Sequence, residues 1–190
     1  MARGDMQFIR QHDLVESPWE NGGGITRNIA QEEDASGPLW RLSMADVDRE
    51  GGFSSFPRLI RILTVIKGDG LVLHGPDGAM MARHAVPVTF DGAMPIIATL
   101  SQGPIRGFNL MFDAERCVGE AHVAREAGSS ELGQVGRTDV LHLIAGNAQV
   151  EGIALQVGDT AISKDRPLCL DLAHDAIALA ITLRCHHDRP

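Results

Sequence analysis

The sequence has no long apolar run and no excess of basic residues. Its longest apolar stretch, Ala176–Leu183, is interrupted by a threonine and is far shorter than the roughly 20 residues that span a bilayer. Acidic residues outnumber basic ones by 25 to 17, whereas proteins that bind nucleic acids depend on clustered Lys and Arg. The sequence therefore predicts no membrane partner and no nucleic-acid partner.

The three cysteines are widely separated and form no CxxC pair. This spacing predicts neither a disulfide framework nor a zinc knuckle, and it fits a reducing compartment. The first residues, 1–6, contain no apolar segment of the kind that a secretory leader requires. We therefore expect a cytoplasmic protein.

What the sequence does contain is a series of short alternating apolar segments separated by Gly, Pro, Asp and Asn. This spacing is typical of the strands of a β-sandwich or barrel, and no long helical pattern accompanies it. The segment 124–136 is predicted to be a loop or linker. The predicted strands are Thr26–Ala30, Leu39–Val47, Leu59–Ile66, Gly70–His74, Pro95–Leu100, Gly107–Phe112, Val140–Ile144, Ala148–Val150, Asp159–Ser163 and Ala176–Leu183.

A weak internal repeat divides the chain into two similar halves. The stretches "LTVIKGDGLVLHG" (63–75) and "LHLIAGNAQVEG" (141–152) share an apolar strand, a glycine turn and a second short strand. This order favours an all-β double cupin (bicupin) of the β-sandwich or barrel type, with a generic β-sandwich as the alternative. We expect an N-terminal module, residues 1–118, and a C-terminal module, residues 119–190, packed as one compact unit.

Four motifs of the first module together resemble the HutD/Ves family. They are Trp19-x-Asn21-Gly22-Gly23-Gly24-x-Thr26-Arg27, Trp40-Arg41-x-Ser43-x-Ala45, Gly52-Phe53-Ser54-x-Phe56-Pro57 with Arg61 after it, and Phe108-Asn109-x-Met111. The resemblance covers essentially the whole chain and implies a compact, RmlC-like bicupin. It also implies a connection with histidine-utilisation gene clusters and the binding or sensing of a pathway metabolite such as formylglutamate. No established catalytic activity comes with it.

The metal-binding pattern of cupin enzymes is missing. These enzymes hold a divalent cation with two histidines spaced H-x-H, a glutamate and a further histidine. Alignment at the glycine turn places Ser55 and Pro57 at the two histidine positions and Arg61 at the glutamate position. The second module offers a single carboxylate, Asp139, at the equivalent positions. The sequence therefore predicts no metal and no other cofactor.

Three arginines of the motif segments indicate a site for an acid. Successive side chains of a strand face opposite sides, and Arg27, Arg41 and Arg61 each share a predicted face with apolar or small residues. A buried ion costs several kcal/mol unless it is paired. A ligand carboxylate would match the planar fork of arginine in a bidentate way. Alternatively, the counter-charge is internal, from Asp46, Asp48, Asp91 or Asp139.

The predicted site gathers these arginines with neutral polar groups that suit a formamide or amide. The ligand-binding residues are predicted to be Asn21, Gly23, Thr26, Arg27, Arg41, Ser43, Arg61 and Asn109, with Trp19, Trp40, Phe56 and Met111 as the pocket wall. The bend at residues 22–24 has two interpretations. It is either a hairpin turn, for which Asn-Gly is a strong signal, or a backbone concavity that binds an anion.

The leading hypothesis is a metal-free bicupin that binds a small carboxylate metabolite, similar to formylglutamate, as a sensor or accessory protein in histidine utilisation. A second hypothesis is a cupin-type enzyme acting on a small carboxylated substrate, with Arg61 stabilising an oxyanion. It lacks an evident general base in the motif segments. A third is a protein-interaction module with an acidic surface. Resemblance to cupin-like proteins also implies a homodimer through sheet edges.

Overall fold

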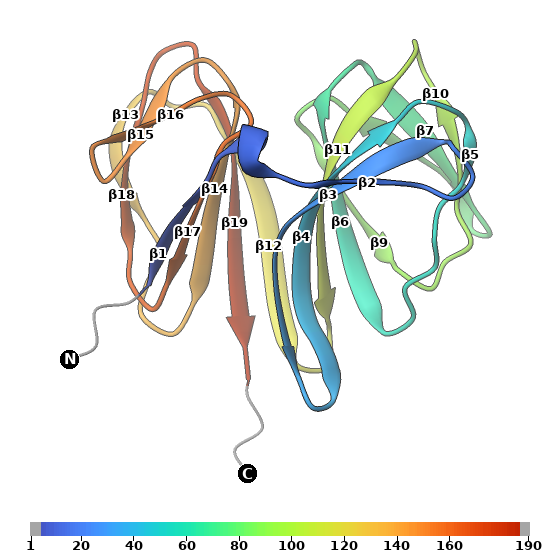
Figure 1. Ribbon diagram of the computed structural model, residues 1–190, viewed down its shortest axis with the longest axis horizontal. Helices are drawn as coiled ribbons and strands as arrows, with labels where there is room; N and C mark the ends of the chain where they lie inside the picture. The colour runs from blue at the N-terminus through green and yellow to red at the C-terminus, as the bar shows by residue number, and fades with distance from the viewer. Residues whose placement is uncertain (1–4, 187–190) are drawn as a thin grey trace. The chain divides into compact units, whose positions relative to one another are not determined.

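The computed structural model describes residues 5–186, which are almost entirely β-structure (Figure 1). They form two compact units: residues 15–117 make one, and the segments before and after them make the other. In the described part of the chain, the single helical element is a short 3-10 turn, η1 (Gln11–Asp13). No helix there has the length and apolar character needed to cross a membrane.

The unit of residues 15–117 consists of two antiparallel sheets. The larger sheet has the order β2 (Glu16–Pro18), β3 (Gly24–Asp34), β4 (Gly37–Val47), β11 (Ile105–Asp113), β6 (Leu59–Lys67) and β9 (Pro87–Asp91). The smaller has the order β5 (Gly51–Gly52), β10 (Ile97–Leu100), β7 (Gly70–Gly75) and β8 (Gly78–Arg83). Val47 and Leu63 of the larger sheet belong to one buried cluster with Leu71 and Ala98 of the smaller. This apolar cluster holds the two sheets together.

The second unit repeats the arrangement of a larger and a smaller antiparallel sheet. Its five-stranded sheet has the order β1 (Met6–Ile9), β17 (Thr160–Lys164), β14 (Thr138–Ala145), β19 (Ile177–Cys185) and β12 (Cys117–Ala124). Its four-stranded sheet has the order β13 (Gly128–Leu132), β18 (Leu168–Leu172), β15 (Ala148–Val150) and β16 (Ile153–Leu155). Leu141, Val150 and Leu170 lie in its buried core.

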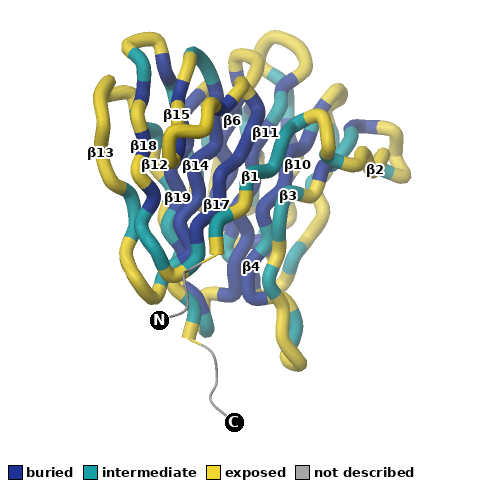
Figure 2. Tube along the Cα trace, turned by 60° about the vertical axis from the view of Figure 1, so that its left-hand side comes forward, coloured by how far each residue is buried: buried dark blue, intermediate teal, exposed yellow. Residues whose placement is uncertain are grey.

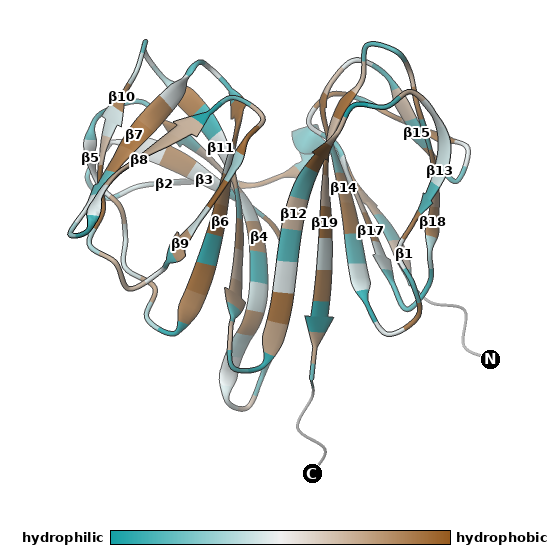
Figure 3. Cartoon of the chain, turned by 180° about the vertical axis from the view of Figure 1, so that it is seen from behind, coloured by the Kyte–Doolittle hydropathy of each residue, from teal (hydrophilic) through white to brown (hydrophobic). Residues whose placement is uncertain are grey.

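Burial and hydropathy follow the strand order. In Figure 2 the central strands β4, β14 and β19 are mainly buried, whereas the edge strand β13 is mainly exposed. Figure 3 shows hydrophobic and hydrophilic residues alternating along β12, as expected for a strand with two different faces.

The two glycine turns of the repeat occupy equivalent places and need glycine for the same reason. Gly68 follows β6 with φ 89°, and Gly146 follows β14 with φ 74°. A side chain at Gly68 would come within 2.7 Å of the Pro104 carbonyl oxygen, and one at Gly146 within 2.4 Å of the Asp175 carbonyl oxygen. Positive φ and close backbone approach together exclude other residues.

The all-β prediction is confirmed, and each predicted strand overlaps an observed one. The segment 124–136 differs from its predicted loop, because it contains β13. The unit boundary also differs from the predicted division after residue 118. Met6 and Phe8 of β1 pair with β17, and this pairing groups the first residues with the second half of the chain.

The cysteines differ from their predicted state. Cys169 is free and exposed. Cys117 and Cys185 are disulfide-bonded, so the prediction of no disulfide framework is wrong for these two residues.

Candidate functional site

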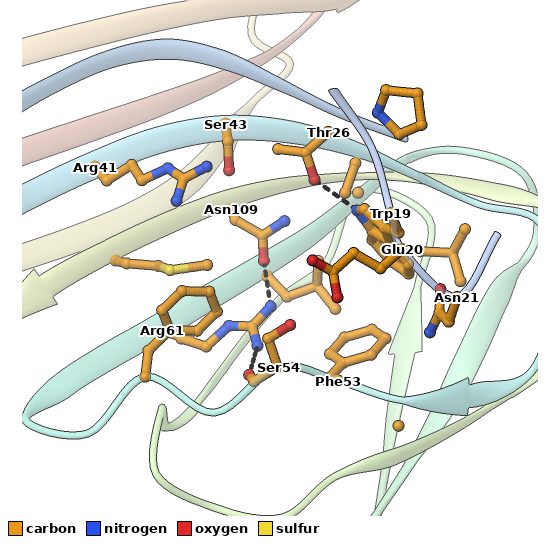
Figure 4. A pocket seen from close by; sticks show the side chains of 18 residues that line it. Trp19, Glu20, Asn21, Thr26, Arg41, Ser43, Phe53, Ser54, Arg61 and Asn109 are labelled. Atoms are coloured by element: carbon orange, nitrogen blue, oxygen red, sulfur yellow. Dashed lines mark hydrogen bonds between the residues drawn. The ribbon is translucent and has the colours of Figure 1, made fainter. Parts of the chain in front are cut away.

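A pocket of about 450 Å³ opens in the unit of residues 15–117 (Figure 4). Strands β4, β6 and β11 supply its floor, and the segments around residues 18–21 and 52–56 supply its sides. Most of the predicted site residues line it, namely Trp19, Asn21, Thr26, Arg41, Ser43, Phe56, Arg61, Asn109 and Met111. A pocket of this size suits a small metabolite.

Strand register explains why these side chains meet. Met111 of β11 lies opposite Arg61 of β6 on one side and Arg41 of β4 on the other. The next inward-facing row of the same strands contains Asn109, with Leu63 and Ser43 opposite it. Residues paired across a sheet share a face, so both rows point into the pocket.

Arg61 is buried in this arrangement, with 5% of its surface exposed. Its Nη2 donates to Asn109 Oδ1 at 2.9 Å, and its Nη1 donates to the Ser54 carbonyl oxygen at 3.4 Å (Figure 4). The guanidinium carbon lies 5.1–5.4 Å from the ring centroids of Phe53, Phe56 and Phe90. These rings provide cation–π contacts on an otherwise apolar wall.

Among the described residues, the charge of Arg61 has no negative partner. Within residues 5–186 it forms no ion pair, and its buried Nε has no hydrogen-bond partner. Burial, and to a lesser extent the charge of Arg41, lower the pKa of Arg61 to about 10. The guanidinium is therefore still a cation at neutral pH, and its Nε–H donor makes no hydrogen bond among the described residues. An unsatisfied buried donor of this kind is rare in a purely structural arginine.

Arg41 adds a second cation to the same wall. Its Nε donates to Asn28 Oδ1 at 2.9 Å, and its Nη2 contacts the same oxygen. Burial lowers the pKa of Arg41. No carboxylate of the described chain pairs with it. Two guanidinium groups thus line the pocket, and their hydrogen-bond partners among the described residues are neutral.

The rim of the pocket is the segment between β2 and β3. Trp19 Nε1 donates to Thr26 Oγ1 at 2.8 Å, which fixes the indole above the floor (Figure 4). The Gly22 N–H donates to the Trp19 carbonyl oxygen at 3.0 Å, and the Gly23 N–H donates to Asn21 Oδ1 at 2.9 Å. Because both N–H groups are bonded within the turn, the geometry favours the hairpin interpretation over an anion-binding concavity.

Gly24 carries the tightest steric demand of this bend. A Cβ at residue 24 would lie 2.1 Å from the Asp46 carbonyl oxygen, whereas one at Gly23 would meet only the Asn21 side chain at 3.1 Å. We expect Gly24→Ala to lower the free energy of unfolding by about 2 to 3 kcal/mol through backbone displacement. Gly23→Ala should change it by less than about 1 kcal/mol. Urea unfolding of both variants checks this, and equal effects would contradict it.

Three predicted site residues lie outside the pocket: Gly23, Arg27 and Trp40. Arg27 lies opposite Met44 in the β3–β4 register, on the other face of the sheet from Thr26. Its Nη1 donates to Asp46 Oδ2 at 2.8 Å, and its Nη2 pairs with Glu16. Of the two alternatives for the counter-charge of Arg27, a ligand carboxylate or a carboxylate of the chain, the structure shows the second.

Trp40 lies on the opposite face of β4 from the pocket, because successive side chains of a strand face opposite sides and its neighbour Arg41 points into the pocket. The indole Nε1 donates to Glu32 Oε2 at 3.0 Å, outside the pocket lining. Conversely, Glu20, Phe53, Ser54 and Leu63 line the pocket without having been predicted. Phe53 and Ser54 belong to a motif already quoted from the sequence, which was the signal available for them.

A divalent cation does not fit this lining. Of the described residues, no histidine or cysteine lines the pocket and Glu20 is the one carboxylate that does, while Arg41 and Arg61 would repel a cation. Elsewhere in residues 5–186, no group of three or more His, Cys, Asp or Glu side chains could hold a metal ion. The donor set of the pocket suits an anion instead.

Sequence comparison identifies relatives over most of the chain. A family model described as HutD matches residues 11–182. An uncharacterised 21.2 kDa protein in the hutC 3′ region of Pseudomonas putida is 40% identical over 116 residues, which cover 58% of this chain and 60% of that protein. Protein Ves of Citrobacter koseri is 32% identical over 168 residues, which cover 86% of this chain and 82% of that protein.

Solved structures with the same fold include a HutD protein and a more distant one. HutD from Pseudomonas fluorescens SBW25, in a formate condition, superposes with a TM-score of 0.85 at 28% identity, covering 96% of this chain and 100% of that one. Bacterial pirin YhhW of Escherichia coli, in complex with nickel(II), superposes with a TM-score of 0.70 at 9% identity, covering 96% and 100%. At this identity the likeness shows the fold alone. The predicted cupin-type fold is confirmed.

Proposed function

The chain belongs to the HutD family, and from that membership and the charges of its pocket we propose that it binds a small carboxylate metabolite without a metal. The observation that carries the proposal is Arg61, a guanidinium with 5% exposure and no carboxylate partner among the described residues, at the base of a cavity of about 450 Å³. A carboxylate in the pocket would supply the negative charge that this guanidinium lacks among the described residues.

The second arginine narrows the size and charge of the ligand. Arg41 and Arg61 lie in one cross-strand row with Met111 between them, so a compact dicarboxylate could reach both guanidinium groups. Asn109 and Ser43 in the adjacent row offer neutral donors and acceptors for an amide. An acid similar to formylglutamate has all of these groups.

The relatives support a place in histidine utilisation. One is named by its position in a hutC 3′ region, and another is a HutD. We propose that the protein acts there as a sensor or accessory protein, in which occupancy of the pocket is the function. A cytoplasmic location and a sheet-edge homodimer belong to the same proposal, and cell fractionation and size-exclusion chromatography would test them.

A thermal-shift series tests the proposal. Formylglutamate, glutarate and formate would each be titrated with and without EDTA. Ligand stabilisation grows as RT ln(1 + [L]/Kd), which is about 2.7 kcal/mol at a ligand concentration of 100 Kd. We expect stabilisation by at least one of these acids, unchanged by EDTA. Absence of any shift would favour the interaction-module hypothesis, and a shift abolished by EDTA would overturn the metal-free part.

A further inference from the structure

We propose that Glu20 makes the pocket selective for ligands that carry both a carboxylate, which binds the arginines, and an N–H donor at the end that faces Glu20. This inference rests on the proposed carboxylate-binding function and defines the class of ligand more closely. Glu20 lies outside the residues predicted from the sequence to form the site.

The first observation is the position of Glu20. It belongs to the rim segment between β2 and β3 and lines the pocket, and its carboxylate points into it (Figure 4). The residue is exposed. Within the described chain it makes no hydrogen bond and no ion pair. Its carboxylate is therefore available to a ligand.

The second observation is that Glu20 does not neutralise the arginines. Neither Arg41 nor Arg61 forms an ion pair with it, and the guanidinium of Arg61 bonds to Asn109 and a backbone carbonyl instead. Burial and the nearby Arg41 lower the pKa of Arg61, whereas a close carboxylate would raise it. The pocket thus has a cationic floor and a separate anionic rim.

A ligand that fills this pocket must satisfy both ends. Its carboxylate binds at the floor, its carbon chain contacts the apolar wall of Phe53 and Leu63, and its remaining polar group reaches the rim. A carboxylate accepts hydrogen bonds and cannot donate them, so Glu20 favours the binding of a ligand with an amide or ammonium N–H. It rejects a group that only accepts, because two acceptors face each other. Formylglutamate, with its formamide N–H, falls in this class.

A different role for Glu20 would give a different result. The side chain could act as a built-in substitute for the ligand carboxylate, competing for the arginines. Removal of Glu20 would then strengthen the binding of every carboxylate by the same factor. The selectivity role predicts a change in the ratio between two ligands, and this ratio separates the roles.

The test uses glutaramate and monomethyl glutarate, which share one carboxylate and the same methylene linker. Glutaramate ends in a carboxamide that donates, and the ester ends in a group that only accepts. By titration calorimetry we expect the native protein to prefer glutaramate about tenfold, as for a partly exposed charge-assisted hydrogen bond. In Glu20→Ala and Glu20→Gln the preference should fall to about twofold or less.

The matched control is Glu33→Gln on β3, an exposed glutamate outside the pocket lining. It makes the same charge change and should leave the preference intact. An unchanged ratio in the Glu20 variants, or equal strengthening of both ligands, would overturn the selectivity role while leaving carboxylate binding in place. If the native protein binds neither ligand nor formylglutamate, the proposed function itself fails.

Discussion

Arg61→Met is expected to abolish ligand-induced stabilisation while raising the stability of the ligand-free protein. The lost anchor should weaken carboxylate binding about 100-fold or more, since a buried charge-assisted contact disappears. In the free protein, Arg61 is a desolvated cation with no carboxylate partner among residues 5–186, and methionine can fill the space among the phenylalanine rings. We expect the free energy of unfolding to rise by about 1 to 2 kcal/mol.

Two variants make this result interpretable. Arg49→Met removes an exposed arginine outside the pocket and should alter neither ligand binding nor stability measurably. Arg61→Lys keeps the charge and loses the planar fork, so an intermediate affinity is expected. A fall in stability of more than about 2 kcal/mol in Arg61→Met would instead identify the guanidinium as a structural element. Calorimetry and urea unfolding measure both quantities.

The expected rise in stability follows from how the site is built. A residue that helps the fold is paired in the free protein, as Arg27 is by Asp46 and Glu16. Arg61 has cation–π contacts and two neutral acceptors, Asn109 Oδ1 and the Ser54 carbonyl oxygen, and these offset only part of the cost of its desolvation. A binding residue such as Arg61 lowers the free energy of unfolding of the ligand-free protein, and the bound ligand restores it.

Much of the fold could be predicted because its signals are local. Glycines that require positive φ, such as Gly68 and Gly146, mark the turns, and apolar alternation marks the strands between them. Pairing over long distances has no such signal. β1 joins β17 although most of the chain separates them, and β13 is an exposed edge strand whose polar sequence gives no apolar pattern.

The site was partly predictable for the same reason. Alternation within a strand shows that Arg41 and Ser43 share a face, but it does not show which face of β3 joins them. That depends on the β3–β4 register, where Thr26 pairs with Ala45 and an irregularity follows at residues 28–30. Arg27 was correctly expected to be buried, but its charge is met by Asp46. Glu20 lies in a loop, where no periodicity applies.

Asp46→Ala is the second large effect that we expect, and it concerns the fold alone. Asp46 Oδ2 accepts from Arg27 Nη1 at 2.8 Å and from Arg106 Nη2 at 2.9 Å, and its side chain is 19% exposed. Its removal takes one carboxylate partner from Arg106 and one from the buried Arg27, which keeps Glu16, and this should lower the free energy of unfolding by about 3 to 5 kcal/mol. Asp48→Ala, at an exposed neighbour, should change it by less than about 0.5 kcal/mol.

The dependence of this effect on pH is a sharper test. Although burial acts in the opposite direction, hydrogen bonds from Arg106 and Arg27 hold the pKa of Asp46 below its ordinary value of 3.8. A depressed folded-state pKa stabilises the fold fully above the unfolded pKa, and this stabilisation is lost as pH falls through the folded pKa. The stability gap between the native protein and Asp46→Ala should therefore be constant near neutrality and narrow below about pH 3.8. Because Asp46 does not line the pocket, ligand-induced stabilisation should persist in the variant, and its loss would show that the two networks are coupled.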